Sequence, residues 1–173
     1  MQARTFWKAV TVDRSNLLER FFELLNARGV RFCLIGGQAL NAYVEPVVSL
    51  DLDVVIAAGQ LADVESWLGG HFSLERFPHS LNVSEAGSDL RIQIQLDPRY
   101  AAFVDRATVK DVLGLQVPVA TIEDLLQGKI WAVQDASRRA SKRQKDLADV
   151  ARALERYPHL RAMVPGEILA RLM

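Results

Sequence analysis

The spacing of apolar residues divides this chain into segments with helical and segments with strand periodicity. Apolar residues recur three or four positions apart, as on one face of a helix, over residues 17–25, 61–68, 121–133 and 147–154. Asp13 is suited to cap the first of these helices, and Gly29 to end it. A shorter helix is predicted over residues 38–43, where Pro46 prevents its continuation.

Strand-like segments lie between these helices. Apolar runs over residues 30–35 and 50–56 predict two buried strands. Two further strands are predicted on either side of Asn82, and the second, over residues 90–97, alternates apolar and polar side chains and so has one buried face. Residues 108–119 predict a short hairpin that turns at its glycine, although part of this segment also fits a helix.

Together these segments predict an α/β (α+β) fold, in which a mixed sheet is flanked by helices. The α/β core is expected over residues 1–119. The remaining residues, 120–173, are expected to form a helical C-terminal region packed on the core.

The composition is that of an ordinary globular protein. With 173 residues, of which 50% are hydrophobic, the chain can bury one sizeable core. Lysine plus arginine and aspartate plus glutamate each number 21, so only a local patch can attract nucleic acid. The single cysteine, Cys33, lies in an apolar run, which excludes a disulfide framework. Neither an apolar signal segment nor a run of about 18 apolar residues is present, and a cytoplasmic protein is expected.

The segment most informative about chemistry is a diglycine followed at a distance by two aspartates. The first predicted strand ends in Gly36-Gly37, and after thirteen intervening residues the next strand carries Asp51 and Asp53. Because side chains alternate along a strand, the two carboxylates point to the same side. Like charges at that distance repel, and a divalent cation between them, Mg²⁺ or Mn²⁺, allows both to stay ionised.

The same residues are suited to hold a triphosphate. Without side chains, Gly36 and Gly37 let backbone N–H groups approach a phosphate, and Ser49 adds a hydroxyl. The sequence has neither a P-loop nor a dinucleotide-binding glycine pattern. Each feature taken alone also fits an ordinary turn or a solvent-facing strand end, but the combination at this spacing favours a metal-supported phosphate site.

This arrangement resembles the signature of the nucleotidyltransferase superfamily with the DNA polymerase β-like fold. It is most similar to the minimal and toxin-like bacterial members of the AbiEii kind, over residues 14–156. Such proteins also carry a Lys-Asp pair in a helical region, which corresponds here to Lys145-Asp146, with Asp149 following. The resemblance implies a nucleotidyltransferase-like sheet and a cleft that the helical region closes on one side.

The resemblance also implies a third carboxylate on a neighbouring strand. Asp97 is the candidate, as a third metal ligand and catalytic residue beside Asp51 and Asp53. If Gln95 occupies that position instead, an amide replaces the carboxylate, and the metal site is weaker. The chain also departs from related sequences in lacking an arginine shortly before Asp51.

Several basic residues are candidates for contacts with phosphate. By resemblance, Lys129, Lys145 and Asp146 face the cleft, while Lys129 also fits a lysine that snorkels from an apolar helix. Five basic residues lie within eight positions from residue 138 to residue 145, a cluster that fits either phosphate binding or a solvated helix face. Pairing at i,i+4, between Lys142 and Asp146 and between Lys145 and Asp149, explains part of it.

The resemblance implies transfer of a nucleoside monophosphate from a nucleoside triphosphate to a hydroxyl acceptor. The acceptor is a protein side chain or the 3′ end of an RNA, and a cognate partner protein of a toxin–antitoxin pair is a further expectation. A catalytically silent member of the same fold, which binds a nucleotide or a partner, is the alternative. A sheet order that separates the Gly36 strand from the Asp51 strand would instead indicate an unrelated scaffold.

Overall fold

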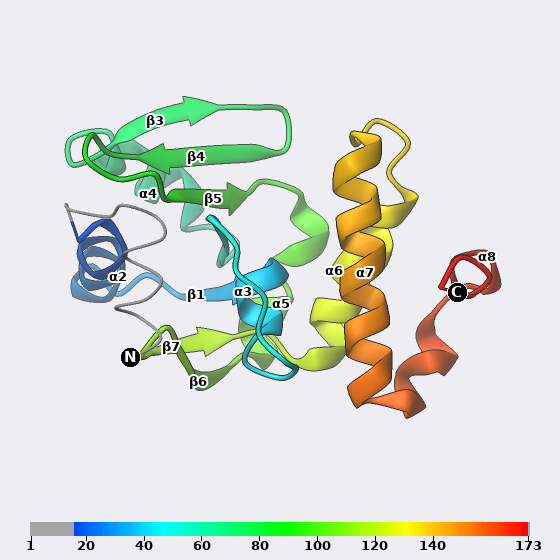
Figure 1. Ribbon diagram of the computed structural model, residues 1–173. Coiled ribbons are helices and arrows are strands. Elements are labelled where there is room, and N and C mark those ends of the chain that lie inside the picture. Colours follow the sequence, from blue (N-terminus) through cyan, green and yellow to red (C-terminus); the bar gives the residue numbers. More distant parts are fainter. Residues whose placement is uncertain (1–15, 173) are drawn as a thin grey trace.

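A seven-stranded mixed sheet forms the centre of the computed structural model, which describes residues 16–172 (Figure 1). The strand order is β3-β4-β5-β2-β1-β7-β6. The strands are β1 (Phe32–Ile35), β2 (Asp51–Ile56), β3 (Ser73–Arg76), β4 (Ser80–Ser84), β5 (Arg91–Gln95), β6 (Thr108–Val112) and β7 (Leu115–Val119). The helices are α2 (Leu17–Ala27), α3 (Gly36–Leu40), α4 (Leu61–Leu68), α5 (Phe103–Arg106), α6 (Ile122–Gln134), α7 (Ala140–Arg156) and α8 (Gly166–Leu169), with 3₁₀ turns η1 (Pro98–Tyr100) and η2 (Pro158–Met163).

Two strand pairings at the centre of the sheet position the site. β1 and β2 are antiparallel with Ile35 opposite Asp53, so the turn that begins at Gly36 lies beside the aspartate strand. β2 and β5 are parallel, and Gln93 is the neighbour of Asp53 in that register. The strand order therefore places the diglycine beside the aspartate pair, as the resemblance implies, and does not separate the two strands as an unrelated scaffold would.

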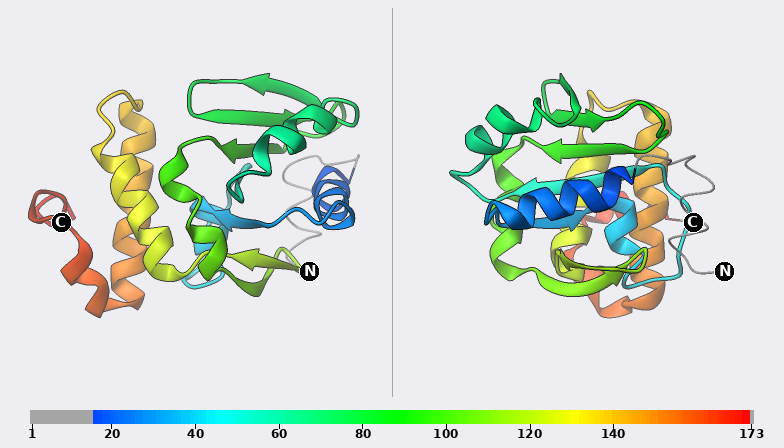
Figure 2. Two further views of the ribbon diagram at one scale, coloured as in Figure 1. Left: turned by 180° about the vertical axis from the view of Figure 1, so that it is seen from behind. Right: turned by 90° about the vertical axis from the view of Figure 1, so that its left-hand side faces the viewer.

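The helices α6 and α7 lie side by side at one end of the sheet, opposite the end at which α2 lies (Figures 1 and 2). α6 begins at Thr121, whose Oγ1 accepts a hydrogen bond of 3.1 Å from the backbone N–H of Asp124. The short helix α3 contacts both α6 and α7. The diglycine turn is thereby placed between the sheet and the helical pair.

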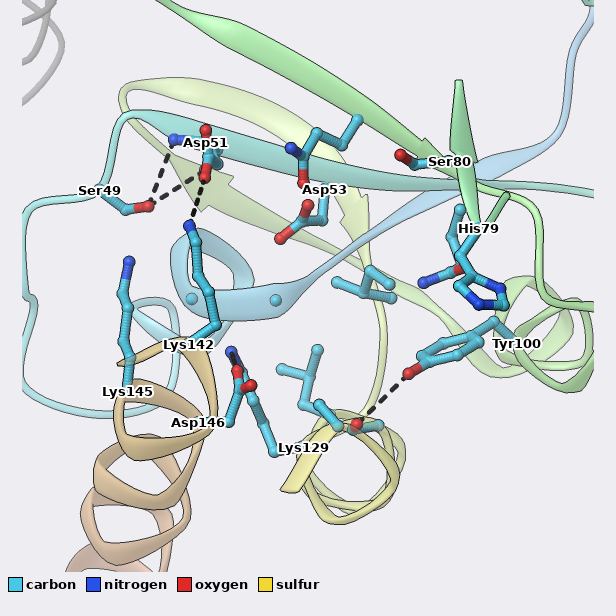
Figure 3. A pocket seen from close by; sticks show the side chains of 18 of the residues that line it. Ser49, Asp51, Asp53, His79, Ser80, Tyr100, Lys129, Lys142, Lys145 and Asp146 are labelled. Carbon is cyan, nitrogen blue, oxygen red and sulfur yellow. Dashed lines mark hydrogen bonds and ion pairs between the residues drawn. The ribbon is translucent and has the colours of Figure 1, made fainter. Parts of the chain in front are cut away.

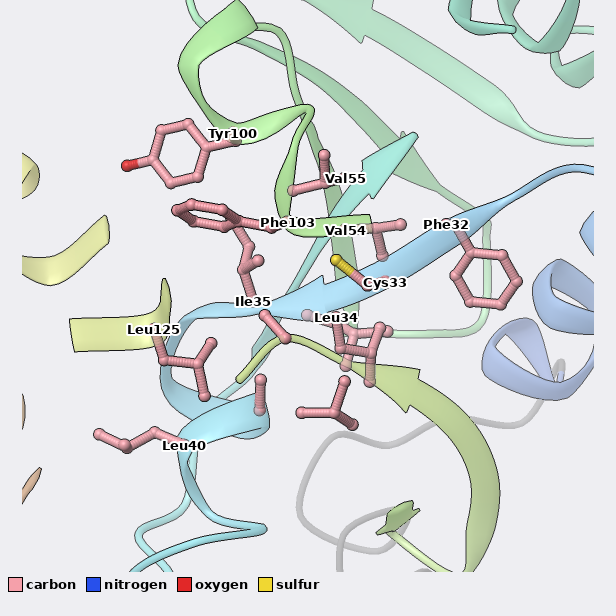
Figure 4. Packing of buried hydrophobic residues seen from close by; sticks show 14 of the residues in the cluster. Phe32, Cys33, Leu34, Ile35, Leu40, Val54, Val55, Tyr100, Phe103 and Leu125 are labelled. Atoms are coloured by element: carbon pink, nitrogen blue, oxygen red, sulfur yellow. The ribbon is translucent and has the colours of Figure 1, made fainter. Parts of the chain in front are cut away.

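β1 lies within the hydrophobic core and is covered on both faces. All four of its residues are buried, and Figure 4 shows Cys33 within a cluster of aliphatic and aromatic side chains, with Val55 its partner on β2. Burial raises the pKa of the Cys33 thiol to about 12, so it is an inert apolar residue. The prediction that Cys33 belongs to the core is confirmed.

Most predicted elements are present, with one error in the number of strands. Asn82 lies within β4 rather than between two strands, because β3, β4 and β5 form a three-stranded antiparallel run. The hairpin predicted over residues 108–119 is formed by β6 and β7. Asp13, the predicted cap, lies outside the described residues. Among residues 16–172, no helix is long and apolar enough to cross a membrane.

Candidate active site

A pocket lies between the ends of the central strands β1, β2 and β5 and the helices α6 and α7 (Figure 3). One end is charged and the other mainly neutral. The charged end is lined by the diglycine turn, Ser49, the aspartate pair, Lys129, Lys142, Lys145 and Asp146. The other end is lined by His79, Ser80, Gln93, Gln95 and Tyr100. The fold thus brings together all the predicted site residues except Asp97.

Asp51 and Asp53 project from the same face of β2 into the charged end of the pocket (Figure 3). Asp51 is paired with two cations: Arg91 Nε is 3.0 Å from Oδ1, and Lys142 Nζ is 3.5 Å from Oδ2. The Asp53 carboxylate forms neither a hydrogen bond nor an ion pair with any residue in 16–172. Burial raises the pKa of the Asp53 carboxyl to about 6, although Lys129 opposes the rise, and Asp51 adds to it by repulsion.

We expect the raised pKa of Asp53 to lower the stability of the metal-free protein. The unfolded carboxyl ionises near pH 3.8 and the folded one near 6, so the loss is absent below pH 3.8, grows between these values and is complete above 6. When Asp53 is fully ionised, the free energy of unfolding is lower by about 3 kcal/mol. Asp53→Asn should raise the free energy of unfolding by about 2 kcal/mol at pH 7.5. This gain is smaller than the full loss because the amide is bulkier than the carboxylate and packs beside Gly36.

Urea unfolding in a chelating buffer measures this effect. At pH 7.5 the variant should be the more stable protein, and the difference should vanish toward pH 4. A difference between variant and wild type that is the same at both pH values, or a variant less stable than wild type at pH 7.5, would contradict the assigned environment of Asp53.

Gly36 is explained by its contact with Asp53. Its φ is +77°, a conformation that favours glycine. A Cβ placed on Gly36 would lie 3.0 Å from Asp53 Cγ and closer still to Oδ2. At Gly37 a Cβ would meet only Asp149 Oδ2, at an ordinary 3.8 Å. The first glycine is therefore required by the carboxylate that packs against it, whereas the second is not.

A buried ion network holds α7 against α6. Lys129 Nζ lies 3.1 Å from Asp146 Oδ1 and 2.8 Å from Asp149 Oδ2, and all three side chains are almost completely buried. Burial alone would lower the pKa of Lys129, but the attraction of Asp149 and Asp146 outweighs it and raises that pKa. Arg138 pairs with Asp146 at 2.6 Å, and Arg152 pairs with Asp149 at 2.7 Å.

The i,i+4 pairing predicted within α7 is wrong. Asp146 and Asp149 point toward Lys129 on α6, and Lys142 pairs with Asp51 on β2 instead. Lys145 is exposed, lines the pocket and forms no ion pair with a residue in 16–172. The basic segment therefore joins different elements rather than only covering a helix face.

Asp97 is not brought to the aspartate pair. It caps η1, where its carboxylate accepts hydrogen bonds from the backbone N–H of Arg99 at 2.9 Å and from the guanidinium of Arg99 at 2.8 and 2.9 Å. The side-chain hydrogen bond from Arg99 lowers the pKa of Asp97. Gln93 stands beside Asp53, and Gln95 lines the pocket while accepting a 3.0 Å hydrogen bond from the Asp97 N–H. Among residues 16–172, no three His, Cys, Asp or Glu side chains are grouped to hold a metal ion.

Ser49 and the residues around it form the entry to β2. Ser49 is buried, its Oγ lies 3.3 Å from the backbone N–H of Asp51, and its carbonyl accepts a 2.9 Å hydrogen bond from Gln38. Arg152 donates to Asn41 Oδ1 and to the Glu45 carbonyl, each at 2.7 Å, which ties this loop to α7. Ser49 is thus held where it was predicted, at the charged end of the pocket.

Sequence reasoning did not identify Arg91, and it did not assign Lys142 and Arg138 to the carboxylates with which they pair. Arg91 and Lys142 pair with Asp51, and Arg138 pairs with Asp146. Arg91 begins β5 and is the register partner of Asp51, so the signal depends on strand pairing rather than on local sequence. Arg91 thus places a guanidinium beside Asp51, although the sequence has no arginine shortly before that aspartate.

The family assignment agrees with this geometry. The family model described as "Nucleotidyl transferase AbiEii toxin, Type IV TA system" matches residues 68–172, which is more than half of the chain. The chain therefore belongs to the AbiEii nucleotidyltransferase toxin family, which links it to toxin–antitoxin systems. The matched region includes Lys129 and the aspartates of α7 and begins after the Asp51–Asp53 pair. A comparison with curated proteins gave no significant match.

Solved structures of nucleotidyltransferases share the fold. The antibiotic-resistance factor ANT(2'')-Ia, in a solution structure, aligns with a TM-score of 0.59 and 13% identity over 86% of this chain and 89% of that chain. The lincosamide antibiotic adenylyltransferase LnuA, in a lincomycin-bound crystal structure, aligns with a TM-score of 0.52 and 13% identity over 80% and 96%. An antigenic nucleotidyltransferase-like protein from Paracoccidioides brasiliensis aligns with a TM-score of 0.51 and 15% identity over 89% of this chain and 76% of that chain. The predicted nucleotidyltransferase-like fold is confirmed.

Proposed function

We propose that this protein transfers a nucleoside monophosphate from a nucleoside triphosphate to a hydroxyl acceptor. The acceptor oxygen bonds to the α-phosphorus and releases its proton to solvent, the bond from that phosphorus to the bridging oxygen breaks, and pyrophosphate leaves. The observation that carries the proposal is the pair Asp51 and Asp53, held on one face of β2 against Gly36 and opposite the lysines of α6 and α7. Membership of a nucleotidyltransferase family supports it.

The aspartate pair fits Mg²⁺ or Mn²⁺. These cations prefer carboxylate oxygens, and Asp53 offers a carboxylate without a partner among residues 16–172. Asp51 Oδ1 is buried and, apart from its 3.0 Å ion pair with Arg91, accepts no hydrogen bond within the described chain. Asp51 and Asp53 would hold the ion, which would neutralise the negative charge that develops on the phosphate during transfer.

The neighbouring groups are suited to the triphosphate. Lys145 is exposed and lines the pocket without an ion pair in residues 16–172, so its ammonium group is available to phosphate oxygens. We assign Ser49 and the backbone of Gly36 and Gly37 to the same ligand. Lys129 and Asp146 are paired with each other, and we assign them the role of fixing α7 beside the pocket.

Incubation with each labelled triphosphate, Mg²⁺ or Mn²⁺, and candidate acceptors tests the proposal. The panel of acceptors includes RNA 3′ ends, the protein itself, lincomycin and tobramycin. The two antibiotics are included because structures with a similar fold are LnuA bound to lincomycin and ANT(2")-Ia in complex with adenylyl-2"-tobramycin. Asp51→Ala/Asp53→Ala should lower transfer by about a hundredfold or more. The matched variant Asp97→Ala should retain transfer because Asp97 does not line the pocket. Undiminished transfer by the double variant would rule out this site.

A second candidate function is nucleotide or partner binding without transfer. It is favoured by Gln93, an amide that stands beside Asp53 where a third carboxylate is expected. In that case calorimetry should detect triphosphate binding that depends on Asp51 and Asp53, while no acceptor is labelled. The toxin–antitoxin link of the family suggests a cognate antitoxin as the partner. Co-expression of this protein with the protein encoded by a neighbouring gene, followed by co-purification, tests that partnership.

A further inference from the structure

The two cations on Asp51 differ in how they are held. Arg91 is fixed beside Asp51 by the register of β5 and is not among the residues that line the pocket. Lys142 comes from a separate element, α7, lines the pocket and points at Asp51 from within it (Figure 3). Its side chain is 35% exposed, while that of Asp51 is 14% exposed. Lys142 is therefore the cation that occupies the space next to the carboxylate.

A divalent cation and Lys142 compete for that space. Lys142 Nζ lies 3.5 Å from Asp51 Oδ2, which is one of the oxygens available to a metal ion. Two positive groups on one carboxylate oxygen repel each other, so the metal displaces the ammonium group. Because a lysine has a flexible stem and a compact charge, it can move without disturbing α7. Among the described residues that line the pocket, no other carboxylate is left for the displaced group. Asp53 would hold the metal, Asp124 is paired with Arg106, and Asp146 is paired with Lys129 and Arg138.

We propose that Lys142 is an exchangeable counter-ion of the metal site. In the nucleotide-free protein it pairs with Asp51 and weakens metal binding, and when metal and triphosphate arrive together it leaves Asp51 for a phosphate oxygen. This inference rests on the proposed function and assigns a regulatory step to the same site. Its consequence is that metal and triphosphate bind with positive coupling.

Titration with Mn²⁺, followed by the electron paramagnetic resonance signal of the free ion, tests the exchange without any acceptor. In the absence of nucleotide, Lys142→Met should bind Mn²⁺ about fivefold more tightly than wild type, because a partly exposed pair no longer competes. Lys145→Met is the matched control on the same helix, and it should change the affinity by less than about twofold because Lys145 has no ion pair within residues 16–172. Lys142→Arg should behave as wild type.

A second titration, with a non-hydrolysable triphosphate present, measures the coupling. The factor by which the nucleotide tightens Mn²⁺ binding should be smaller in Lys142→Met than in wild type. Unchanged or weaker Mn²⁺ binding by Lys142→Met would overturn the exchange, and the proposed function would stand if Asp53→Asn still abolished that binding. Wild-type protein that binds no Mn²⁺ with or without nucleotide would overturn both.

Discussion

Lys129→Met is expected to lower the free energy of unfolding by about 3–5 kcal/mol, because it leaves two buried carboxylates short of their shared cation. Lys129 Nζ lies within 3.1 Å of Asp146 and 2.8 Å of Asp149, whose side chains are only 2% and 5% exposed. Methionine fills a similar volume, so the loss arises from charge rather than from packing. Urea unfolding at pH 7.5 measures it.

Lys142→Met is the matched control for this prediction. It removes the same charge from a pair that is 35% exposed on the lysine side, and we expect a loss of at most about 1 kcal/mol. Asp149→Asn added to Lys129→Met should restore part of the stability, since one uncompensated charge is then removed. A Lys129→Met protein within about 1 kcal/mol of wild type would show that Arg138 and Arg152 alone compensate the two aspartates.

Local periodicity was sufficient to predict most of the sheet and its relation to the motif. β1 and β2 are short apolar runs with a diglycine and an aspartate pair at their ends, and these properties depend only on neighbouring residues. The position of Asn82 was mistaken because β3 is largely exposed and has little apolar signal. Exposed edge strands lack the alternation on which such predictions depend.

The interaction partners of most charged residues could not be predicted from the sequence, because they are set by tertiary structure. Which residue stands beside Asp53 is set by the register of β2 against β5, and that register made Gln93 the neighbour. For Asp97 a local signal was available, because an aspartate before a proline is typical of a helix cap, and it caps η1. Asp146 and Asp149 share a helical face with Val150 and Ala153, a periodicity that indicates burial rather than solvent-exposed pairing.

Gly36→Ala is expected to lower the free energy of unfolding by about 3 kcal/mol and to abolish Mn²⁺ binding. A Cβ at φ +77° is strained, and it would lie 3.0 Å from Asp53 Cγ, so the carboxylate must rotate out of its position. Gly37→Ala is the matched control, with its nearest contact at 3.8 Å, and should behave as wild type in both measurements.

The double variant Gly36→Ala/Asp53→Ala separates the two causes of the Gly36→Ala effect. The reference for the double variant is Asp53→Ala, which also lacks the buried charge. Removing the carboxylate relieves the steric overlap but not the strained φ. The double variant should therefore lose, relative to Asp53→Ala, about half of the stability that Gly36→Ala loses relative to wild type, and it should recover none of the Mn²⁺ binding. If Gly36→Ala bound Mn²⁺ as wild type does, the close approach of Gly36 to Asp53 would have no part in forming the site. Equal losses in the two comparisons would assign the whole loss to the backbone. The steric overlap and the strained φ both arise at Gly36. The first glycine of the pair is therefore explained by the Asp53 carboxylate that packs against it.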